Sequence, residues 1–281
     1  MKTDRRLWLK ALAAWPLAAA LPAAADALET IRQRGRLRIA IYNNFPPYAL
    51  AGGKGIDADL GRAIAEKLGL APEIVSFTAD DDMNDDLRNM VWKGHYLGTQ
   101  PADVMMHVPV DEHLARANDK VRIFGAYHRE TLALARNPQR LQALSGSAAM
   151  ALEVFTREKI GVEVSTLADS FLLSVLNGRL RENVVHFRSV AEAAKALTDG
   201  NVAAVLAPRG ELEAALKGDG SMLIETPKLA ELKIDGWPLG MAVKAEEAAL
   251  AEAIGGALAD LKRDGSVAAI FKRYGISHLA G

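Results

Sequence analysis

Short apolar runs alternate with longer amphipathic stretches along almost the whole chain, and this alternation limits the possible fold more than any other feature. The first apolar run covers residues 37–41 and the last covers residues 239–243, while the stretches between such runs place apolar side chains at helical spacing. Strands separated by helices are typical of βαβ units and of a mostly parallel sheet. The sequence therefore predicts an α/β fold with sheets flanked by helices.

The loop after the first predicted strand carries two rings on either side of two prolines. Phe45 precedes Pro46 and Pro47, and Tyr48 follows them. Because proline fixes φ and removes a backbone donor, this loop is expected to hold both rings in place at the carboxyl end of a strand, where α/β sheets bind ligands. Asp57 is expected to cap the helix that follows. An ordinary strand, loop and helix with two core rings explains the same pattern.

Residues 1–25 have the order of an export signal. Four basic residues precede an apolar run at residues 11–21, and Ala23–Ala25 supply small side chains for a cleavage site. A membrane anchor would need about 20 apolar residues, and this run is shorter. We expect cleavage near Ala25 and a periplasmic protein. The adjacent arginines near the start are also similar to a twin-arginine signal, so the export route stays open.

Composition excludes several classes of protein. Without residues 1–25, which hold four of the 34 basic and one of the 35 acidic side chains, the net charge is −4, so no basic field would attract nucleic acid. The chain has no cysteine, which removes thiol nucleophiles and cysteine-ligated metals. No later apolar stretch is long enough to cross a bilayer. We therefore expect a mature protein that binds no nucleic acid and does not span a membrane.

Several strings, in a shared order, resemble the periplasmic solute-binding proteins of family 3, the amino-acid type. They are RGRLRIAIYNNFPPY and GIDADLGRAIAEKLGL near the start, GNVAAVLAPRGELEAAL later, and LADLKRDGSVAAIFKRYGI near the end. The resemblance implies a two-lobed type II periplasmic-binding-protein fold that closes on a small molecule. Each lobe would hold a central, mostly parallel sheet flanked by helices, and a two-segment hinge would join the lobes.

The same resemblance supplies the lobe boundaries, because composition shows no linker. Residues 121–130 resemble the family's segment that enters the second lobe, and residues 235–243 resemble its return. It follows that lobe one would be residues 26–128 plus 240–281, and lobe two would be residues 129–239.

The residues that usually hold an amino acid in this family are altered here. The family binds the ligand carboxylate with a forked arginine, a bidentate contact, but the matching stretch at residues 107–115 has none and Arg116 lies beside the position. Where the family has an acid for the ligand amine, this chain has Ala207 and Pro208. The resemblance therefore implies that the usual clamp is lost. Arg209 could be a displaced carboxylate partner, with no matching acid for the amine.

Ser165 and Thr166 precede a predicted helix, where hydroxyls and free N–H groups can bind an anion, although a plain N-cap explains the pair as well. The residues that we predict to bind ligand are Phe45, Tyr48, Trp92, Tyr96, His107, Ser165, Thr166 and Arg209.

Residues 81–111 are rich in methionine and rings, and they closely resemble a subgroup of solute-binding-like proteins encoded beside quinoprotein alcohol dehydrogenases, including those of methanol-oxidation clusters. This resemblance implies a non-catalytic accessory or ligand-binding partner of a PQQ-dependent dehydrogenase. Five side chains would line an apolar cleft or a partner surface, namely Met90, Trp92, Tyr96, Met105 and Met106. Packing in the core is the alternative, and we expect it for at least one of the two adjacent methionines.

Two other functions remain open. The chain could be the receptor of an ABC importer for an amino acid or another small organic solute, working with a permease. It could also be a periplasmic dehydratase on the same scaffold, for which Glu163 and Asp169 are the nearest candidates. A dehydratase needs a cleft carboxyl group with a raised pKa.

No metal site or cofactor is predicted. Acidic side chains alternate from Asp80 to Asp86 as in a calcium-binding loop, but Asp85 and Val91 stand where such a loop needs glycine and glutamate. A solvated loop in which one acid caps the next helix is the better interpretation. The six histidines are scattered without the spacing of metal ligands.

Overall fold

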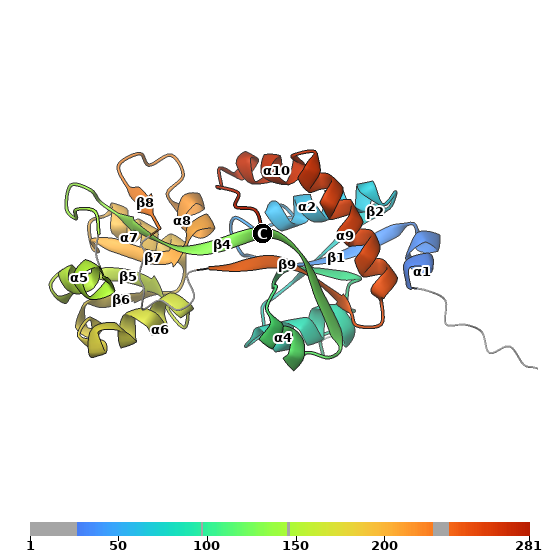
Figure 1. Ribbon diagram of the computed structural model, residues 1–281, viewed down its shortest axis with the longest axis horizontal. Helices are drawn as coiled ribbons and strands as arrows, with labels where there is room; N and C mark the ends of the chain where they lie inside the picture. Colours follow the sequence, from blue (N-terminus) through green and yellow to red (C-terminus); the bar gives the residue numbers. More distant parts are fainter. Residues whose placement is uncertain (1–26, 97, 145–146, 227–235) are drawn as a thin grey trace, which may run out of the picture.

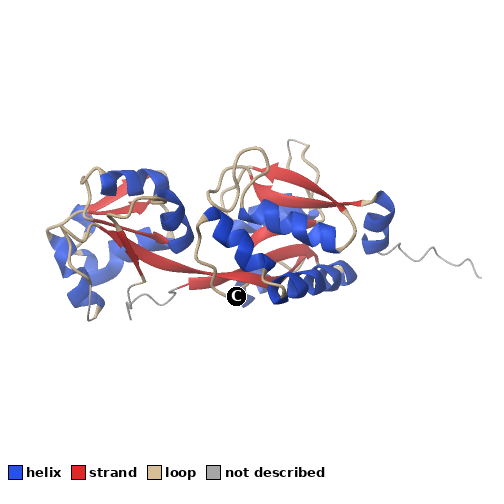
Figure 2. Cartoon of the chain, turned by 90° about the horizontal axis from the view of Figure 1, so that it is seen from above, coloured by secondary structure: helices blue, strands red, loops and turns tan. Residues whose placement is uncertain are grey.

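The computed structural model describes residues 27–96, 98–144, 147–226 and 236–281. The predicted export signal lies outside these residues. Figure 1 shows two bodies side by side, joined by two long strands, and the view from above in Figure 2 shows the same separation. No helix in the described ranges is both long and apolar enough to span a membrane.

The first body starts with the predicted alternation of helices and strands. Its elements in chain order are α1 (Ala27–Arg34), β1 (Arg36–Tyr42), α2 (Ile56–Lys67), β2 (Ala71–Phe77), α3 (Met83–Leu87), the π-helical η1 (Arg88–Trp92), β3 (Val104–Pro109) and α4 (Glu112–Ala117). The body is completed from the other end of the chain by α9 (Ala248–Arg263) and α10 (Ser266–Tyr274). The strands β1 and β2 pair in parallel, as do β1 and β3.

The second body repeats this alternation in shorter elements. They are α5 (Ala148–Leu152), η2 (Glu153–Thr156), β5 (Ile160–Glu163), α6 (Leu167–Ser174), η3 (Val175–Gly178), η4 (Arg181–Asn183), β6 (Val184–Phe187), α7 (Val190–Thr198), β7 (Ala204–Pro208), α8 (Arg209–Ala215) and β8 (Leu223–Glu225). Its buried apolar residues form two clusters of their own, within residues 132–216. The first body has a separate core, drawn from residues 28–127 and 239–276.

Two antiparallel strands, β4 (Val121–Arg136) and β9 (Gly236–Lys244), run from one body into the other. The strand order is β2-β1-β3-β9-β4-β7-β5-β6, with β8 beside β4. Residues 121–124 and 131–135 read as two separate strands in the sequence, but β4 is continuous and its register with β9 shifts between Phe124 and His128. The predicted lobe boundaries fall inside these two strands and stay predictions.

The start of α2 differs from the prediction that Asp57 caps it. The N-cap is Gly55 at φ 112°, without a side-chain cap. A Cβ at Gly55 would overlap the carbonyl oxygen of Tyr48, so glycine lets the loop approach the helix closely. Asp57 lies in the first turn instead, completely buried.

Candidate functional site

A cavity of about 250 Å³ opens at the carboxyl ends of β1 and β3 in the first body. This is where open α/β sheets bind ligands. It is lined by Tyr42, Asn43, Asn44, Phe45, Ala79, Met83 and His107. No lysine, arginine, aspartate or glutamate is among these residues. The wall of the pocket therefore combines aromatic rings with two amide side chains and one imidazole.

Three of the predicted ligand-binding residues meet at this cavity. The ring of His107 lies 4.8 Å from that of Phe45 at 90°, and 4.3 Å from that of Tyr48 at 58°. Tyr48 is only 1% exposed and does not line the cavity. Tyr48 therefore packs behind the rings of Phe45 and His107. It is not part of the cavity wall, where a ligand-binding ring was expected.

His107 is held in place by a buried carboxylate. Its Nδ1 lies 3.1 Å from Oδ2 of Asp57, and the hydroxyl of Tyr127 donates a hydrogen bond of 2.7 Å to Oδ1. His107 has a φ of 64°, a left-handed conformation that is uncommon for a residue other than glycine. Asp57 and Tyr127 were missed by the sequence analysis, because they lie 50 and 20 residues from His107 in the chain.

The pocket is linked to the second body through Glu130 of β4. The hydroxyl of Tyr48 donates to this carboxylate, and the backbone N–H of Gly210, at the start of α8, donates to it over 3.4 Å. Glu211 follows on α8, and its charge contributes to the raised pKa of the Tyr48 hydroxyl. Helix α8 therefore lies directly against Glu130 and Tyr48, the residues that support the pocket.

Three carboxyl groups gather at this junction. Burial raises the pKa of Glu130, Glu163 and Glu211, and the pKa of Glu211 is raised further by the charges of the other two. No lysine or arginine in the described ranges forms an ion pair with any of them. The sequence analysis found no matching acid for a ligand amine, and that remains a prediction; Glu163 and Glu211 of the second body are close enough for the charge of one to raise the pKa of the other.

Arg209 does not reach the cavity. Its guanidinium binds Glu213 one turn along α8 at 3.1 Å and the hydroxyl of Thr226 at 2.8 Å. Glu213 in turn accepts a hydrogen bond from the backbone N–H of Ser277, in the C-terminal segment of the first body. Arg209 therefore stabilises a contact between the two bodies, and its contact with a ligand stays a prediction.

Ser165 and Thr166 are used in capping α6. The hydroxyl of Thr166 accepts from the backbone N–H of Asp169 and donates to the carbonyl of Glu163, and the backbone N–H of Ser165 donates to the Asp169 carboxylate. The side chain of Asp169 also binds His186 at 2.9 Å. Local capping accounts for all of these contacts, and it leaves Glu163 as the better candidate for a reactive carboxyl group.

Of the methionine- and ring-rich segment at residues 81–111, Met83 and His107 line the cavity, but the five residues predicted for a cleft or partner surface do not. Met90, Met105 and Met106 are buried in the core of the first body, so the predicted role of these three residues at a cleft or partner surface is wrong. Trp92 is 37% exposed and Tyr96 is 86% exposed, and neither lines the cavity.

The acidic residues between Asp80 and Asp86 stabilise the local structure. Asp82 caps α3 by accepting from the backbone N–H groups of Asn84 and Asp85, as predicted for one acid of this loop. Asp86 is buried and accepts a hydrogen bond of 2.7 Å from the Tyr42 hydroxyl. In the part of the chain that the structure describes, no group of three or more histidine or acidic side chains could hold a metal ion.

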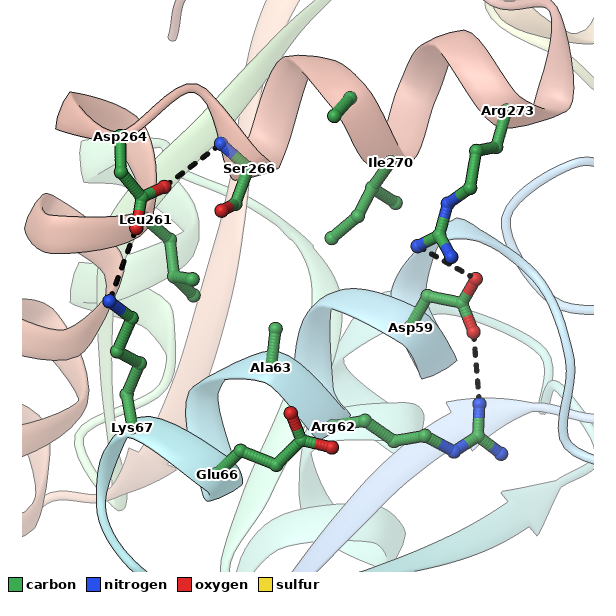
Figure 3. Close-up of a pocket in the computed structure, with 11 residues that line it drawn as sticks. Asp59, Arg62, Ala63, Glu66, Lys67, Leu261, Asp264, Ser266, Ile270 and Arg273 are labelled. Carbon is green, nitrogen blue, oxygen red and sulfur yellow. Dashed lines mark hydrogen bonds and ion pairs between the residues drawn. The ribbon is translucent and has the colours of Figure 1, made fainter.

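A second, larger hollow of about 640 Å³ lies between α2, α9 and α10 (Figure 3). Asp59 pairs there with Arg62 and Arg273, and Lys67 pairs with Asp264. These ion pairs neutralise one another across the helices. A charged ligand is therefore not needed to compensate them.

No protein-family model matches the chain, and no curated protein matches its sequence. Solved structures do match its fold over most of its length. One is an ancestral cationic amino acid solute-binding protein, at 19% identity, a TM-score of 0.68, and coverage of 88% of this chain and 99% of the other. Another is an amino acid ABC transporter substrate-binding protein from Streptococcus pneumoniae bound to L-arginine, at 18% identity, a TM-score of 0.62, and coverage of 90% and 100%.

A third is an ancestral amino-acid-binding protein described as a precursor of cyclohexadienyl dehydratase, at 18% identity, a TM-score of 0.61, and coverage of 89% and 100%. At these identities the likeness shows the fold. The chain has the two-lobed, type II periplasmic-binding-protein fold that the sequence predicted.

Proposed function

We propose that this chain is a non-catalytic receptor that encloses a small organic solute between its two lobes, in the periplasm, and works with an ABC permease. The observation that carries the proposal is the ring-lined cavity at the carboxyl ends of β1 and β3, beside the two strands that connect the bodies. The solved structures with this fold that are described as amino acid binding proteins support this function better than a role beside a quinoprotein dehydrogenase.

Each of the two bodies would contribute different groups to ligand binding. Phe45 and His107 offer a wall and a polar contact in the first lobe, while Glu163 and Glu211 offer carboxyl groups in the second. Bending of β4 and β9 would close one lobe on the other, as in the hinge closure of binding proteins. Tyr48, Glu130 and Gly210 already join the lobes near this hinge.

The solute class follows from the unpaired carboxyl groups. Glu163 and Glu211 are partly buried, and a ligand amine or guanidine placed beside them would stabilise carboxylates that burial disfavours. We therefore propose a small solute with a cationic group and an apolar or ring-contacting body, such as a basic amino acid.

Isothermal titration calorimetry of the exported protein tests this function. The panel comprises the standard amino acids and small amines, each with wild type and with Phe45→Ala. We expect at least one basic solute to bind at micromolar concentration. The absence of binding for every member, with no small molecule retained in native mass spectrometry of periplasmic protein, would overturn the proposal.

An accessory role beside a quinoprotein dehydrogenase stays a prediction from the resemblance of residues 81–111. The exposure of Trp92 and Tyr96 is the observation that favours it, because solvent-exposed rings are enriched at protein contacts. Co-purification from the periplasm distinguishes the two functions. Recovery of a quinoprotein dehydrogenase that is lost in the Trp92→Ala, Tyr96→Ala double variant would favour the accessory, while recovery of a permease alone would favour the receptor.

A dehydratase is the remaining candidate, and the raised pKa of Glu163 favours it because a protonated carboxyl group can act as a general acid. Its test is turnover of cyclohexadienyl acids by wild type. Activity that is unchanged in Glu163→Gln, or no activity at all, would rule out a dehydratase that uses Glu163.

A further inference from the structure

No lysine or arginine lines the cavity, and His107 is the one lining side chain that can carry a positive charge. We infer that His107, held by the buried carboxylate of Asp57, is the anion-binding group of the first lobe and binds a ligand carboxylate as an imidazolium. This inference rests on the proposed function, because it names the group that the same pocket recognises.

The first support is the position of Asp57. Its side chain is fully buried, and both of its oxygens are used, one by His107 and one by Tyr127. No lysine or arginine in the described part of the chain pairs with it. A buried carboxylate is strongly destabilising unless a positive charge compensates it. Asp57 lies in the first turn of α2, whose N-terminal end is partly positive, and a protonated His107 ring would supply the full charge that pairs with it.

The second support is the orientation of the ring. Nδ1 points inward to Asp57, so Nε2 lies on the opposite edge, and no described residue forms a hydrogen bond with it. His107 lines the cavity and is kept at a φ of 64°. Residues held in such uncommon conformations need a surrounding structure that enforces them. The bond to Asp57 and the rings of Phe45 and Tyr48 provide it.

The other titratable groups near His107 are three tyrosine hydroxyls, His128 and Glu130. Burial raises the pKa of the hydroxyls of Tyr42, Tyr48 and Tyr127, so these stay neutral. On β4, burial lowers the pKa of His128 to about 4 and raises that of Glu130. An imidazolium donates from both ring nitrogens, so Nε2–H can bind a carboxylate while Nδ1–H remains bound to Asp57.

Binding of a carboxylate should therefore take up a proton wherever free His107 is neutral. Histidine side chains change charge between about pH 5 and pH 8. In that range the affinity for a carboxylate should fall up to tenfold for each pH unit of increase. A neutral His107 that donates Nδ1–H to Asp57 can only accept a hydrogen bond at Nε2, and a carboxylate cannot donate one.

Benzoate and benzamide are the probes, because they share a ring that suits the cavity and differ in charge. Nitrogen-15 NMR of the imidazoles in the full mature chain follows each probe from pH 5 to pH 8. We expect benzoate to shift the titration of His107 upward by about one pH unit or more, and benzamide to leave it unchanged. Equal shifts with both probes, no shift with benzoate at any pH, or tighter benzoate binding at higher pH would overturn the inference.

Variants separate the roles of the residues. His107→Asn keeps a side chain that tolerates positive φ and should lower benzoate affinity at pH 6 by tenfold or more and abolish its pH dependence. His113→Asn, an exposed histidine on α4, should change neither. Tyr127→Phe leaves the Asp57 charge in place and should keep the pH dependence, whereas Asp57→Asn should remove most of the upward shift. A full pH dependence in Asp57→Asn would mean that Asp57 is not the positioning residue.

The two proposals fail in different ways. If a solute of the calorimetric panel binds with an affinity that does not depend on pH, the receptor function stands and the role of His107 fails. If no panel member binds but benzoate still shifts the His107 titration, the receptor function fails and the anion site stands.

Discussion

The two sides of the proposed binding site are built in opposite ways. On the first body, rings pack on one another and the buried Asp57 already has two hydrogen-bonded partners. On the second body, Glu163 and Glu211 have raised pKa values, and no lysine or arginine among the described residues forms an ion pair with them. The difference teaches that the first side fixes the shape of the site before a ligand arrives, whereas the second side depends on a charge that the ligand brings.

The largest effect is expected from removing the support of the first side. Asp57→Ala leaves Nδ1 of His107 and the hydroxyl of Tyr127 without a partner in a buried place, and it opens a small void. We expect the free energy of unfolding to fall by about 3 kcal/mol, measured by urea denaturation at pH 7. Asp81→Ala, at an exposed position in the acidic loop, is the control and should be within about 0.5 kcal/mol of wild type. A similar small loss for Asp57→Ala would show that the first side is not fixed by this residue.

The next effect concerns the shape of the pocket. Phe45→Ala removes a ring from the cavity wall and should weaken the best ligand of the calorimetric panel by tenfold or more, which corresponds to about 1.4 kcal/mol. Tyr96→Ala removes a ring that is 86% exposed and lies outside the cavity lining, so its affinity should equal that of wild type. Equal losses in the two variants would mean that the cavity at β1 and β3 is not the binding site.

Much of the fold could be predicted because its elements follow their own periodicity. Residues 246–262 have the apolar spacing of a long amphipathic helix, and the structure has α9 there, at Ala248–Arg263. The continuous strand β4 could not be predicted, because Gly125 and the polar residues after it interrupt the apolar pattern, and the partner β9 follows them with a shifted register. A strand that connects two bodies is stabilised by its pairing more than by its own composition.

The candidate site was predictable only in part. The rings of Phe45 and Tyr48 and the imidazole of His107 were identified from the sequence, and the structure brings them together. Asp57 looked like a helix cap, because its contact with His107 depends on how α2 packs against β3. Met90, Met105 and Met106 were assigned to a cleft lining, because the sequence does not distinguish an apolar side chain in the core from one at a cleft.

The second side predicts a dependence of stability on pH. Burial and the neighbouring carboxylates hold the pKa of Glu211 above its ordinary value, so the folded state binds a proton more tightly than the unfolded state. The contribution of Glu211 to stability therefore falls as the pH rises above about 4.5, the ordinary value for glutamate. Glu211→Gln should raise the melting temperature by about 2–4 °C at pH 7 and leave it unchanged at pH 4. A variant that lowers the melting temperature at pH 7 would show that the carboxylate is already compensated.

The smallest effect decides whether α6 belongs to the second side at all. Thr166→Ala removes the N-cap hydroxyl that accepts from Asp169 and should cost about 1 kcal/mol of stability, measured by urea denaturation, while Thr166→Ser should restore it. If the hydroxyl only caps the helix, calorimetry of both variants will give the affinity of wild type once the protein is folded. If affinity falls in Thr166→Ala and returns in Thr166→Ser, the helix start contacts the ligand, and the second side then contributes hydrogen-bond donors as well as the unpaired carboxyl groups.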